Sequence, residues 1–364
     1  MKYNDIRRMT REVRVGKIAI GGQNPITIQS MTNTDTLNAE ATVSQIRAME
    51  REGCDIVRIS VPTLEAAETI TAIKAAGIRI PIVADIHFDY RIALRCSELG
   101  FDKIRINPGN IGDDERVRAV CDACRAKKIP IRIGVNSGSL EKHILAKHGA
   151  PTPEALCESA LYHAALLEKF DFYDTVISIK ASTVPDMIRA NRLLAAACDY
   201  PLHLGVTEAG GGERGMIKSG IGIGSLLCDG IGDTLRVSLT DDPVREIGAA
   251  KKILQAIGIE GQCGLDIVSC PTCARTKIDL IPLVKAFEAA VNEAGLADVP
   301  VKVALMGCVV NGPGEAREAD VGIAGGIGEA VLFRHGEIVE KIPEDAVIER
   351  LISEIRLLKD GMEK

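Results

Sequence analysis

Short β-branched runs alternate with amphipathic stretches along most of this chain, and this alternation limits the possible folds more than any other feature. Eight runs are expected to be strands, at residues 26–31, 55–61, 80–86, 103–107, 130–136, 175–181, 201–208 and 234–239. Stretches that fit helices lie between them, for example at 38–51, 113–127, 153–169, 184–197 and 243–257. This order is typical of parallel strands joined by crossover helices. Eight units in about 250 residues predict an α/β fold with an N-terminal (β/α)8 TIM barrel.

An open, doubly wound parallel sheet is the alternative to a barrel. It is less favoured because no G-x-G-x-x-G motif follows the first predicted strand. The connection at residues 137–152 is longer than an ordinary link between two elements. We therefore expect it to be a loop on the active face of the barrel.

After Gly258 the pattern changes to cysteine-containing loops around shorter elements. Helices are expected at 280–294 and 343–358, and strands at 299–305, 321–324, 330–335 and 337–341, the last two forming a hairpin. The sequence therefore predicts two domains, a barrel over residues 1–258 and a smaller α+β domain over residues 259–364.

The composition excludes several classes of partner. The 364 residues include 44 basic and 50 acidic side chains, so no overall positive field exists to hold nucleic acid or an anionic membrane. Aromatic residues make up 3% and Trp is absent, which argues against base-stacking surfaces. The N-terminus lacks a secretory signal and no run of 18 apolar residues occurs, which predicts a cytoplasmic protein without a membrane segment.

Polar side chains inside the predicted barrel strands are the first functional signal. Strand residues alternate between the helix layer and the barrel centre. The isoleucines of the strand at 103–107 would face the helices, so Arg105 and Asn107 would point inward. The same alternation turns further polar residues inward on the other strands, namely Arg58, Ser60, Arg132, Asn136, Ser178, Lys180, Arg236 and Ser238.

Five of these inward residues are cations, and buried cations are costly without partners. For a single arginine, a structural ion pair is the better interpretation. For five, the acids expected at the same mouth, Asp85 and Glu208, leave three positive charges unmatched. Arg, Lys, Asn and Ser together suit phosphoryl oxygens, so an anion with two phosphoryl groups is the predicted ligand. His87, on the same face as Asp85, could donate a hydrogen bond or a proton.

The cysteines give the second signal. Eleven cysteines in a chain without an export signal predict core residues and metal ligands rather than disulfides. Cys270 and Cys273 form a C-x-x-C pair and Cys308 lies in a Gly/Pro-rich turn, so three thiolates can converge on one metal centre. The fourth ligand stays open among Cys263, Glu315 and His335. We favour an iron–sulfur cluster over zinc, since an exchangeable carboxylate would let one iron bind substrate.

Five motifs, in order, resemble those of a known family. They are Arg105-Ile-Asn-Pro-Gly-Asn110, Arg132-Ile-Gly-Val-Asn136, Gly205-Val-Thr-Glu-Ala-Gly210, Ser269-Cys-Pro-Thr-Cys273 and Met306-Gly-Cys-Val-Val-Asn-Gly-Pro-Gly-Glu315. From about Ile26 to Ala324 the chain resembles the 4-hydroxy-3-methylbut-2-enyl diphosphate synthases of the methylerythritol phosphate route to isoprenoids. Its length and two-domain layout are similar to the compact bacterial form.

This resemblance implies an iron–sulfur oxidoreductase. Its substrate would be 2-C-methyl-D-erythritol 2,4-cyclodiphosphate, which it would open reductively with loss of water, using two electrons from reduced flavodoxin or ferredoxin. One [4Fe-4S] cluster would be held by Cys270, Cys273, Cys308 and Glu315. The resemblance also implies homodimers, in which the small domain of one subunit caps the barrel of its partner. By the same resemblance the diphosphate would be held by Arg58, Arg105, Asn107, Arg132, Asn136, Lys180, Arg236 and Ser238, with Asp85 and His87 assigned to the same pocket by position.

Glu208 is implied as the carboxylate that handles a proton. Strand alternation turns Thr207 inward instead, so Glu208 is expected where the strand ends and the chain turns. Two other functions stay open. The first is a zinc-ribbon barrel enzyme that acts non-reductively on a phosphorylated substrate, which zinc without acid-labile sulfide would favour. The second is an electron carrier, which would function without Arg105 or Lys180.

Overall fold

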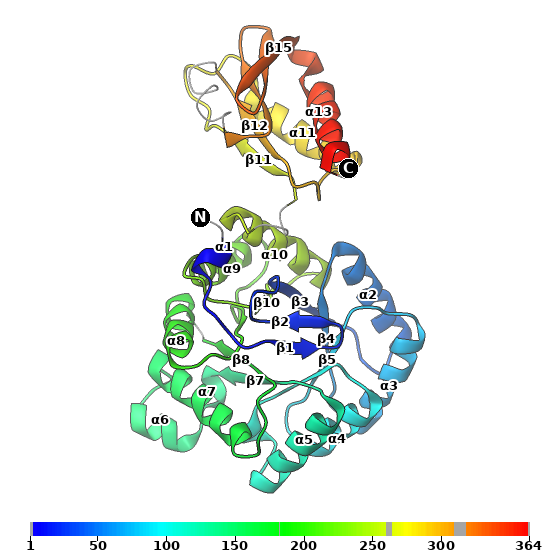
Figure 1. The fold of residues 1–364 in the computed structure, drawn as a ribbon, viewed down its shortest axis with the longest axis vertical. Coiled ribbons are helices and arrows are strands. Elements are labelled where there is room, and N and C mark those ends of the chain that lie inside the picture. The colour runs from blue at the N-terminus through cyan, green and yellow to red at the C-terminus, as the bar shows by residue number, and fades with distance from the viewer. Residues whose placement is uncertain (1–2, 182, 260–263, 309–317, 363–364) are drawn as a thin grey trace. The chain divides into compact units, whose positions relative to one another are not determined.

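The structure is a computed structural model that describes residues 3–181, 183–259, 264–308 and 318–362. The chain divides into two compact units, Met1–Ile257 and Gly258–Lys364. The larger unit is a barrel surrounded by helices, and the smaller unit is a mixed sheet with helices packed on it (Figure 1).

The barrel consists of eight parallel strands, β3 (Thr27–Met31), β4 (Ile56–Ser60), β5 (Ile82–Asp85), β6 (Lys103–Ile106), β7 (Ile131–Asn136), β8 (Thr175–Lys180), β9 (His203–Leu204) and β10 (Thr234–Leu235). Strands β3 to β8 neighbour each other in chain order, and β10 lies between β3 and β9. A parallel bridge between Ile177 of β8 and Leu202, next to β9, closes the ring. The predicted TIM barrel is confirmed.

Helices surround this ring (Figure 1), namely α2 (Ala39–Glu52), α3 (Leu64–Ala75), α4 (Tyr90–Leu99), α5 (Asp114–Lys127), α7 (Pro153–Glu168), α8 (Val184–Ala197), α9 (Gly212–Cys228) and α10 (Pro243–Ile257). Capping side chains set their starts. Asn38, Thr63 and Asp113 each accept a hydrogen bond from the backbone N–H three residues later. Among the described residues, no helix combines the length and the apolar character that crossing a membrane requires.

An N-terminal hairpin of β1 (Val13–Val15) and β2 (Ile18–Ile20) lies across one end of the barrel (Figure 1). Its Ile20 packs with Ile56 and Val83, which lie at the N-terminal ends of β4 and β5. The sequence analysis did not predict this hairpin because three-residue strands show too little alternation. The hairpin closes the N-terminal end of the barrel with apolar side chains.

Two strand ends differ from the prediction, and the long connection after β7 contains secondary structure of its own. Strands β9 and β10 end at Leu204 and Leu235, four residues before their predicted ends. Beyond them the chain keeps the hydrogen bond from Arg236 N to Leu204 O, at 2.9 Å, and then departs from the ladder. The long connection after β7 contains a 3₁₀ turn, η2 (Ser137–Ser139), and a short helix, α6 (Lys142–His148).

The smaller unit contains a five-stranded sheet in the order β11 (Asp266–Ser269), β12 (Lys302–Met306), β13 (Val321–Gly325), β14 (Glu329–Arg334) and β15 (Glu337–Pro343). Its first three strands are parallel and the last two are antiparallel. Phe287 of α11 (Leu280–Glu293) and Leu351 of α13 (Val347–Met362) pack in one core with Val303. The final helix begins at Val347 and not at Pro343, which is the last residue of β15.

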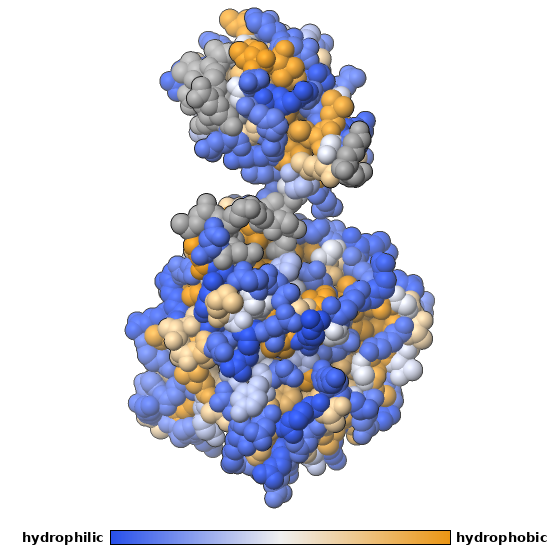
Figure 2. Space-filling model, in the orientation of Figure 1, coloured by the Kyte–Doolittle hydropathy of each residue, from blue (hydrophilic) through white to orange (hydrophobic). Residues whose placement is uncertain are grey.

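Hydrophobic residues gather on the part of the smaller unit formed by β15 and α13 (Figure 2). Ile338 and Val339 of β15 and Leu357 of α13 are exposed. Strand β15 is the edge of its sheet, and Glu340 and Lys341 follow these two apolar residues. Charges of this kind limit the pairing of an exposed edge strand with other chains.

Candidate active site

A cavity of about 420 Å³ opens among the C-terminal ends of the barrel strands, where TIM barrels carry their active sites. Its wall is formed by Arg58, Asp85, His87, Arg105, Arg132, Asn136, Ser137, Gly138, Ser178, Lys180, Ala181, Thr207 and Glu208. Of the eleven barrel residues that were assigned a role in the site, the structure brings together eight, and the predicted inward residue Ser178 joins them. The other three, Asn107, Arg236 and Ser238, are not part of this wall.

Strand register aligns the charged residues. Asp85 of β5 is the register partner of Arg105 on β6, which is the partner of Arg132 on β7. Further round the barrel, Asn136 of β7 is the partner of Lys180 on β8. Register partners in adjacent strands point to the same side of the sheet. One acid and two arginines are thus placed side by side by the backbone alone.

Asp85 is the centre of the ion pairs in the cavity. Its Oδ1 lies 3.1 Å from Nη1 of Arg105, and its Oδ2 lies 3.7 Å from Nε of Arg58. Burial alone would raise the pKa of Asp85, but the charges of Arg58, Arg105 and Arg132 lower it to about 2. Asp85 is therefore ionised at neutral pH and holds two guanidinium groups in place.

The cations of the cavity repel one another. Burial, together with the charges of Arg58, Arg236, Arg132 and Arg105, holds the pKa of Lys180 well below its usual range. Burial also lowers the pKa of Arg58 to about 10. Four cations and two carboxylates line the cavity, so the cations exceed the acids by two. An anionic ligand would relieve this repulsion.

Glu208 and His87 lie at the rim. Glu208 has a φ of 56° and sits where the chain turns after β9, and both it and Thr207 line the cavity. The Nε2 atom of His87 is 3.9 Å from Oδ2 of Asp85, and its side chain is 48% exposed. Both side chains can therefore reach a ligand in the cavity and solvent outside it.

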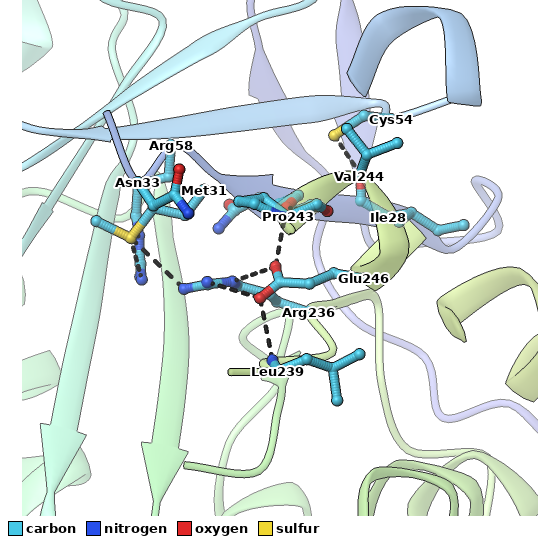
Figure 3. A network of polar contacts seen from close by, with 12 residues as sticks. Ile28, Met31, Asn33, Cys54, Arg58, Arg236, Leu239, Pro243, Val244 and Glu246 are labelled. Carbon is cyan, nitrogen blue, oxygen red and sulfur yellow. Dashed lines mark hydrogen bonds and ion pairs between the residues drawn. The ribbon is translucent and has the colours of Figure 1, made fainter. Parts of the chain in front are cut away.

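Arg236 has a partner that the sequence analysis missed (Figure 3). Glu246 of α10 is 2% exposed and accepts hydrogen bonds from Nε and Nη2 of Arg236, both at 3.0 Å. This bidentate pair neutralises Arg236. The prediction that only two carboxylates oppose the five cations is therefore wrong. Glu246 lies on the apolar stripe of α10 with Ile247 and Ala250. An acidic residue in such a stripe is the sequence signal that could have revealed a buried partner.

Met31 of β3 connects two of the arginines (Figure 3). Its sulfur lies 3.1 Å from Nε and 2.9 Å from Nη2 of Arg58, and 3.5 Å from Nη1 of Arg236. A thioether is a weak, neutral acceptor. Met31 therefore orients both guanidinium groups without neutralising their charge.

Asn107 supports a loop at the mouth instead of its wall. Its side chain accepts a hydrogen bond from the Gly109 N–H at 3.1 Å and donates one to Ser139 Oγ at 3.3 Å. It thereby connects η1 (Pro108–Asn110) to η2. Ser238 is partly buried, and its hydroxyl has no hydrogen-bond partner within the described residues.

A buried pair anchors the loop that lines one side of the cavity. Ser137 and Gly138 of this loop contribute to the wall, as expected for the connection at 137–152. Directly before α6, Oε1 of Glu141 lies 2.5 Å from Nε2 of the fully buried His163 on α7. Burial raises the pKa of Glu141, but its hydrogen bonds, chiefly with His163, lower it to about 2.

Two of the predicted metal ligands follow neighbouring parallel strands of the smaller unit. Cys270 comes directly after β11, and Cys308 comes two residues after its partner β12. The Gly307 N–H donates to Sγ of Cys270 at 3.3 Å. A Cβ on Gly307 would lie 2.7 Å from Cγ2 of Thr276, so only glycine permits this close approach.

The third thiol, Cys273, is exposed on the loop after β11. Hydrogen bonds from Arg275 lower its pKa. Lys277 N donates to Gly307 O at 2.8 Å and so ties the two cysteine loops together. No group of three or more metal-binding side chains is assembled within residues 264–308 and 318–362 or elsewhere in the described chain. Of the three candidate fourth ligands, His335 lies 3.8 Å from Asp320, whereas Glu315 and Cys263 lie outside the described residues.

Known proteins match the chain over nearly its whole length. A family model described as the GcpE TIM-barrel domain matches residues 10–251, and one described as the GcpE protein C-terminal domain matches residues 266–357. A protein of Caldanaerobacter subterraneus named 4-hydroxy-3-methylbut-2-en-1-yl diphosphate synthase (flavodoxin) is 56% identical, over 96% of this chain and 97% of its own. Proteins of the same name from Clostridium perfringens (56% identical, 97% and 99% covered) and Geobacillus kaustophilus (53%, 97% and 93%) are also similar.

Solved structures with low sequence identity share the barrel. A sialic acid synthetase from Leptospira borgpetersenii aligns with a TM-score of 0.51 at 11% identity, over 78% of this chain and 98% of that one. A type I 3-dehydroquinate dehydratase from Clostridium difficile aligns with a TM-score of 0.51 at 15% identity, over 68% and 98%. These two similarities support the fold alone.

Proposed function

The chain belongs to the GcpE family, the 4-hydroxy-3-methylbut-2-en-1-yl diphosphate synthases, and from this membership we propose its reaction and the residues that carry it. The reaction is the reductive ring opening and dehydration of 2-C-methyl-D-erythritol 2,4-cyclodiphosphate to 4-hydroxy-3-methylbut-2-enyl diphosphate, a step of isoprenoid precursor biosynthesis. Two electrons and a proton are consumed, a ring C–O bond breaks and water leaves. The relatives give no support to a zinc-ribbon enzyme.

The observation that carries this proposal is the excess of positive charge on the cavity wall. Four cations against two carboxylates leave two positive charges, which complement a cyclic diphosphate with one negative charge on each phosphoryl group. We assign the phosphoryl oxygens to Arg105, Arg132 and Lys180, with Asn136 and Ser178 as neutral partners. Arg58 and Asp85 hold this set in position.

Ring opening creates a new terminal oxygen on the diphosphate and so adds negative charge at the cavity wall. Cations that are already desolvated and fixed stabilise such a charge without further reorganisation. Glu208, at the exposed turn after β9, is assigned to hold or deliver the proton at its carboxyl oxygen. We assign Arg236, Asn107 and Ser238 to shaping the mouth, since none of them lines the cavity.

The cofactor is proposed to be a [4Fe-4S] cluster, held by Cys270, Cys273, Cys308 and Glu315. When bound, such a cluster supplies electrons one at a time. The donor set supports this choice, because soft thiols follow two adjacent strands and the third thiol lies on a loop tied to them. The Gly307 N–H that donates to Sγ of Cys270 would stabilise a negatively charged sulfur there.

Reduced flavodoxin is the proposed electron donor, since the names of the relatives specify it, and ferredoxin is the alternative. We also propose a cytoplasmic homodimer, in which the small domain of one subunit completes the barrel site of the other. Measurement of the molar mass of the cluster-loaded protein in solution tests the dimer.

The test of the reaction is an anaerobic assay of the cluster-loaded protein with the cyclic diphosphate and reduced flavodoxin, with product detected by mass spectrometry. We expect turnover by the wild type and a loss of about ten- to a hundredfold in kcat/KM for Lys180→Met, as for removal of a charged hydrogen-bond partner. Lys127→Met, an exposed lysine at the end of α5, is the matched control and should keep full activity.

Two results would contradict the proposal. The first is the absence of product from protein that contains iron and acid-labile sulfide. The second is equal turnover by Lys180→Met and the wild type, which would show that the cavity is not the site of the reaction.

A further inference from the structure

Beneath the cavity, the barrel interior contains a second set of polar side chains that the proposed reaction uses only in part. They are Thr27, Gln29, Lys103, Arg132 and His203, here called the inner basic layer. All five are buried, and Lys103 is 0% exposed. Each has a polar atom without a hydrogen-bond partner within the described residues, namely Thr27 Oγ1, Gln29 Nε2, Lys103 Nζ, Arg132 Nε and His203 Nε2. Native interiors pair nearly all such atoms, so this set points to a ligand.

Register places the inner basic layer inside the barrel. Thr27 and His203 are both partners of Thr234 on β10, and Lys103 is the partner of Val83 on β5. Val83 packs against the N-terminal hairpin, which closes the layer from that end. Arg132 belongs both to this layer and to the wall of the cavity above it. The hairpin thus closes the layer on one side, and the cation-lined cavity lies on the other.

The bonds within the layer leave mainly donors unpaired. Nη1 of Arg132 donates to Oε1 of Gln29 at 3.4 Å, so the Gln29 amide oxygen is occupied and its NH₂ group is not. Nδ1 of His203 lies 3.3 Å from Oγ1 of Thr234, which leaves Nε2. The ammonium of Lys103 and the Nε–H of Arg132 can only donate. A ligand that accepts several hydrogen bonds fits this set.

The charges that lower the pKa values in the layer have one sign. Burial, with the charges of Arg132 and Arg58, holds the pKa of Lys103 well below its usual range. The charges that lower it are those of two arginines. Burial, Arg132 and Lys103 likewise hold the pKa of His203 well below its usual range, which favours its neutral ring. A water molecule would satisfy the donors, but only an anion would also favour the charged forms of Lys103 and Arg132, which burial disfavours.

We propose that the inner basic layer binds one small inorganic anion, with chloride as its occupant. The anion would accept hydrogen bonds from Lys103, Arg132 and Gln29 beneath the diphosphate site. It would stabilise the folded barrel by pairing the donors of the layer and by favouring the charged forms of Lys103 and Arg132. This proposal does not depend on the proposed reaction, since the layer belongs to the barrel whichever substrate the cavity takes.

The first experiment measures thermal unfolding of the full-length, cluster-loaded protein while chloride replaces gluconate at constant ionic strength. We expect a saturable rise in Tm of about 2–4 °C for the wild type. Lys103→Met removes the buried ammonium and should abolish the saturable rise. Lys127→Met is the exposed control, and it should keep the full rise. The cations of the cavity are unchanged in both variants, so chloride binding there would raise Tm equally in all three proteins.

The second experiment uses bromide as the probe and needs no variant. Crystals of the wild type grown or soaked in bromide should show an anomalous peak inside the barrel, within hydrogen-bond distance of Lys103 Nζ and Arg132 Nε. A layer filled by water alone, with no peak at this position, would overturn the proposal. An equal rise in Tm for the wild type and Lys103→Met would overturn it as well.

Discussion

At the scale of single residues, the position of Arg105 depends on the absence of one methyl group. An ideal Cβ on Gly134 would lie 2.5 Å from Nε and 2.6 Å from Nη2 of Arg105, closer than real atoms approach. The guanidinium therefore lies across the glycine, from where it reaches Asp85 at 3.1 Å. Gly134 is two residues after Arg132 on the same inward face of β7, so a side chain there would enter the cavity region.

We predict that Gly134→Ala lowers affinity for the cyclic diphosphate about ten- to a hundredfold and leaves folding nearly unchanged. The atoms that must move are the end of a flexible side chain, so the fold tolerates the methyl group, whereas Arg105 loses its place. Isothermal titration and thermal unfolding measure the two effects. Gly220→Ala, on α9 with no atom within 4 Å of the new Cβ, is the control and should bind normally. Equal affinities of the two variants would refute this role of Gly134.

Residue alternation predicted the inward cations well because neighbouring strands share one register. Arg58, Arg105 and Lys180 could be placed from the pattern of isoleucines and valines alone. The pairing of Glu246 with Arg236 could not be predicted in this way, because Glu246 lies on a helix and strand alternation says nothing about helix residues. Alternation also turns Lys103 inward, as it does Arg105. Its depth in the barrel could not be predicted, because that depends on which end of the strands the hairpin closes. Sequence therefore predicts the side of the sheet better than the depth in the barrel.

At the scale of elements, strand and helix starts were predicted closely where capping residues or β-branched runs mark them. Helix α10 spans the predicted residues 243–257, and β7 begins one residue after its predicted start. The ends of β9 and β10 were placed too late, because apolar residues continue where the ladder has already stopped. Hydrogen bonding to a neighbour, and not composition, sets a strand's end.

The pair of Glu141 and His163 supports a prediction about the cavity loop. His163→Phe removes the partner of a mostly buried carboxylate, so the segment from Ser137 to Glu141 should lose its anchor. We expect KM to rise about tenfold with a smaller change in kcat, and trypsin to cleave more readily at Lys142. His163→Gln, which keeps a donor near the position of Nε2, should restore much of the loss.

The control for this pair is a second histidine–glutamate pair, which joins α6 to α7. Nε2 of His148 lies 2.8 Å from Oε2 of Glu158, at a more exposed position. His148→Phe should therefore change KM little, since exposed pairs contribute little. If His148→Phe and His163→Phe raise KM equally, the loop is not held specifically by the buried pair.

At the scale of the whole molecule, the proposed chemistry is divided between two units that fold around separate cores. The residues proposed to bind the diphosphate lie in the barrel. The thiols follow β11 and β12 of the smaller unit, whose core includes Phe287 and Leu351. No described thiol lines the cavity. Binding of the diphosphate and loading of the cluster should therefore be separable, although turnover requires both.

This division predicts opposite phenotypes for two variants. Cys270→Ala should lose iron and turnover, yet bind inorganic diphosphate within about threefold of the wild type, because its cavity is intact. Arg105→Met should keep its iron and its cluster spectrum, yet bind diphosphate about ten- to a hundredfold more weakly. Cys228→Ala, an exposed cysteine at the end of α9, should change neither property. Loss of both properties in either of the first two variants would show that the units depend on each other for folding, and the separation of binding from electron transfer would have to be abandoned.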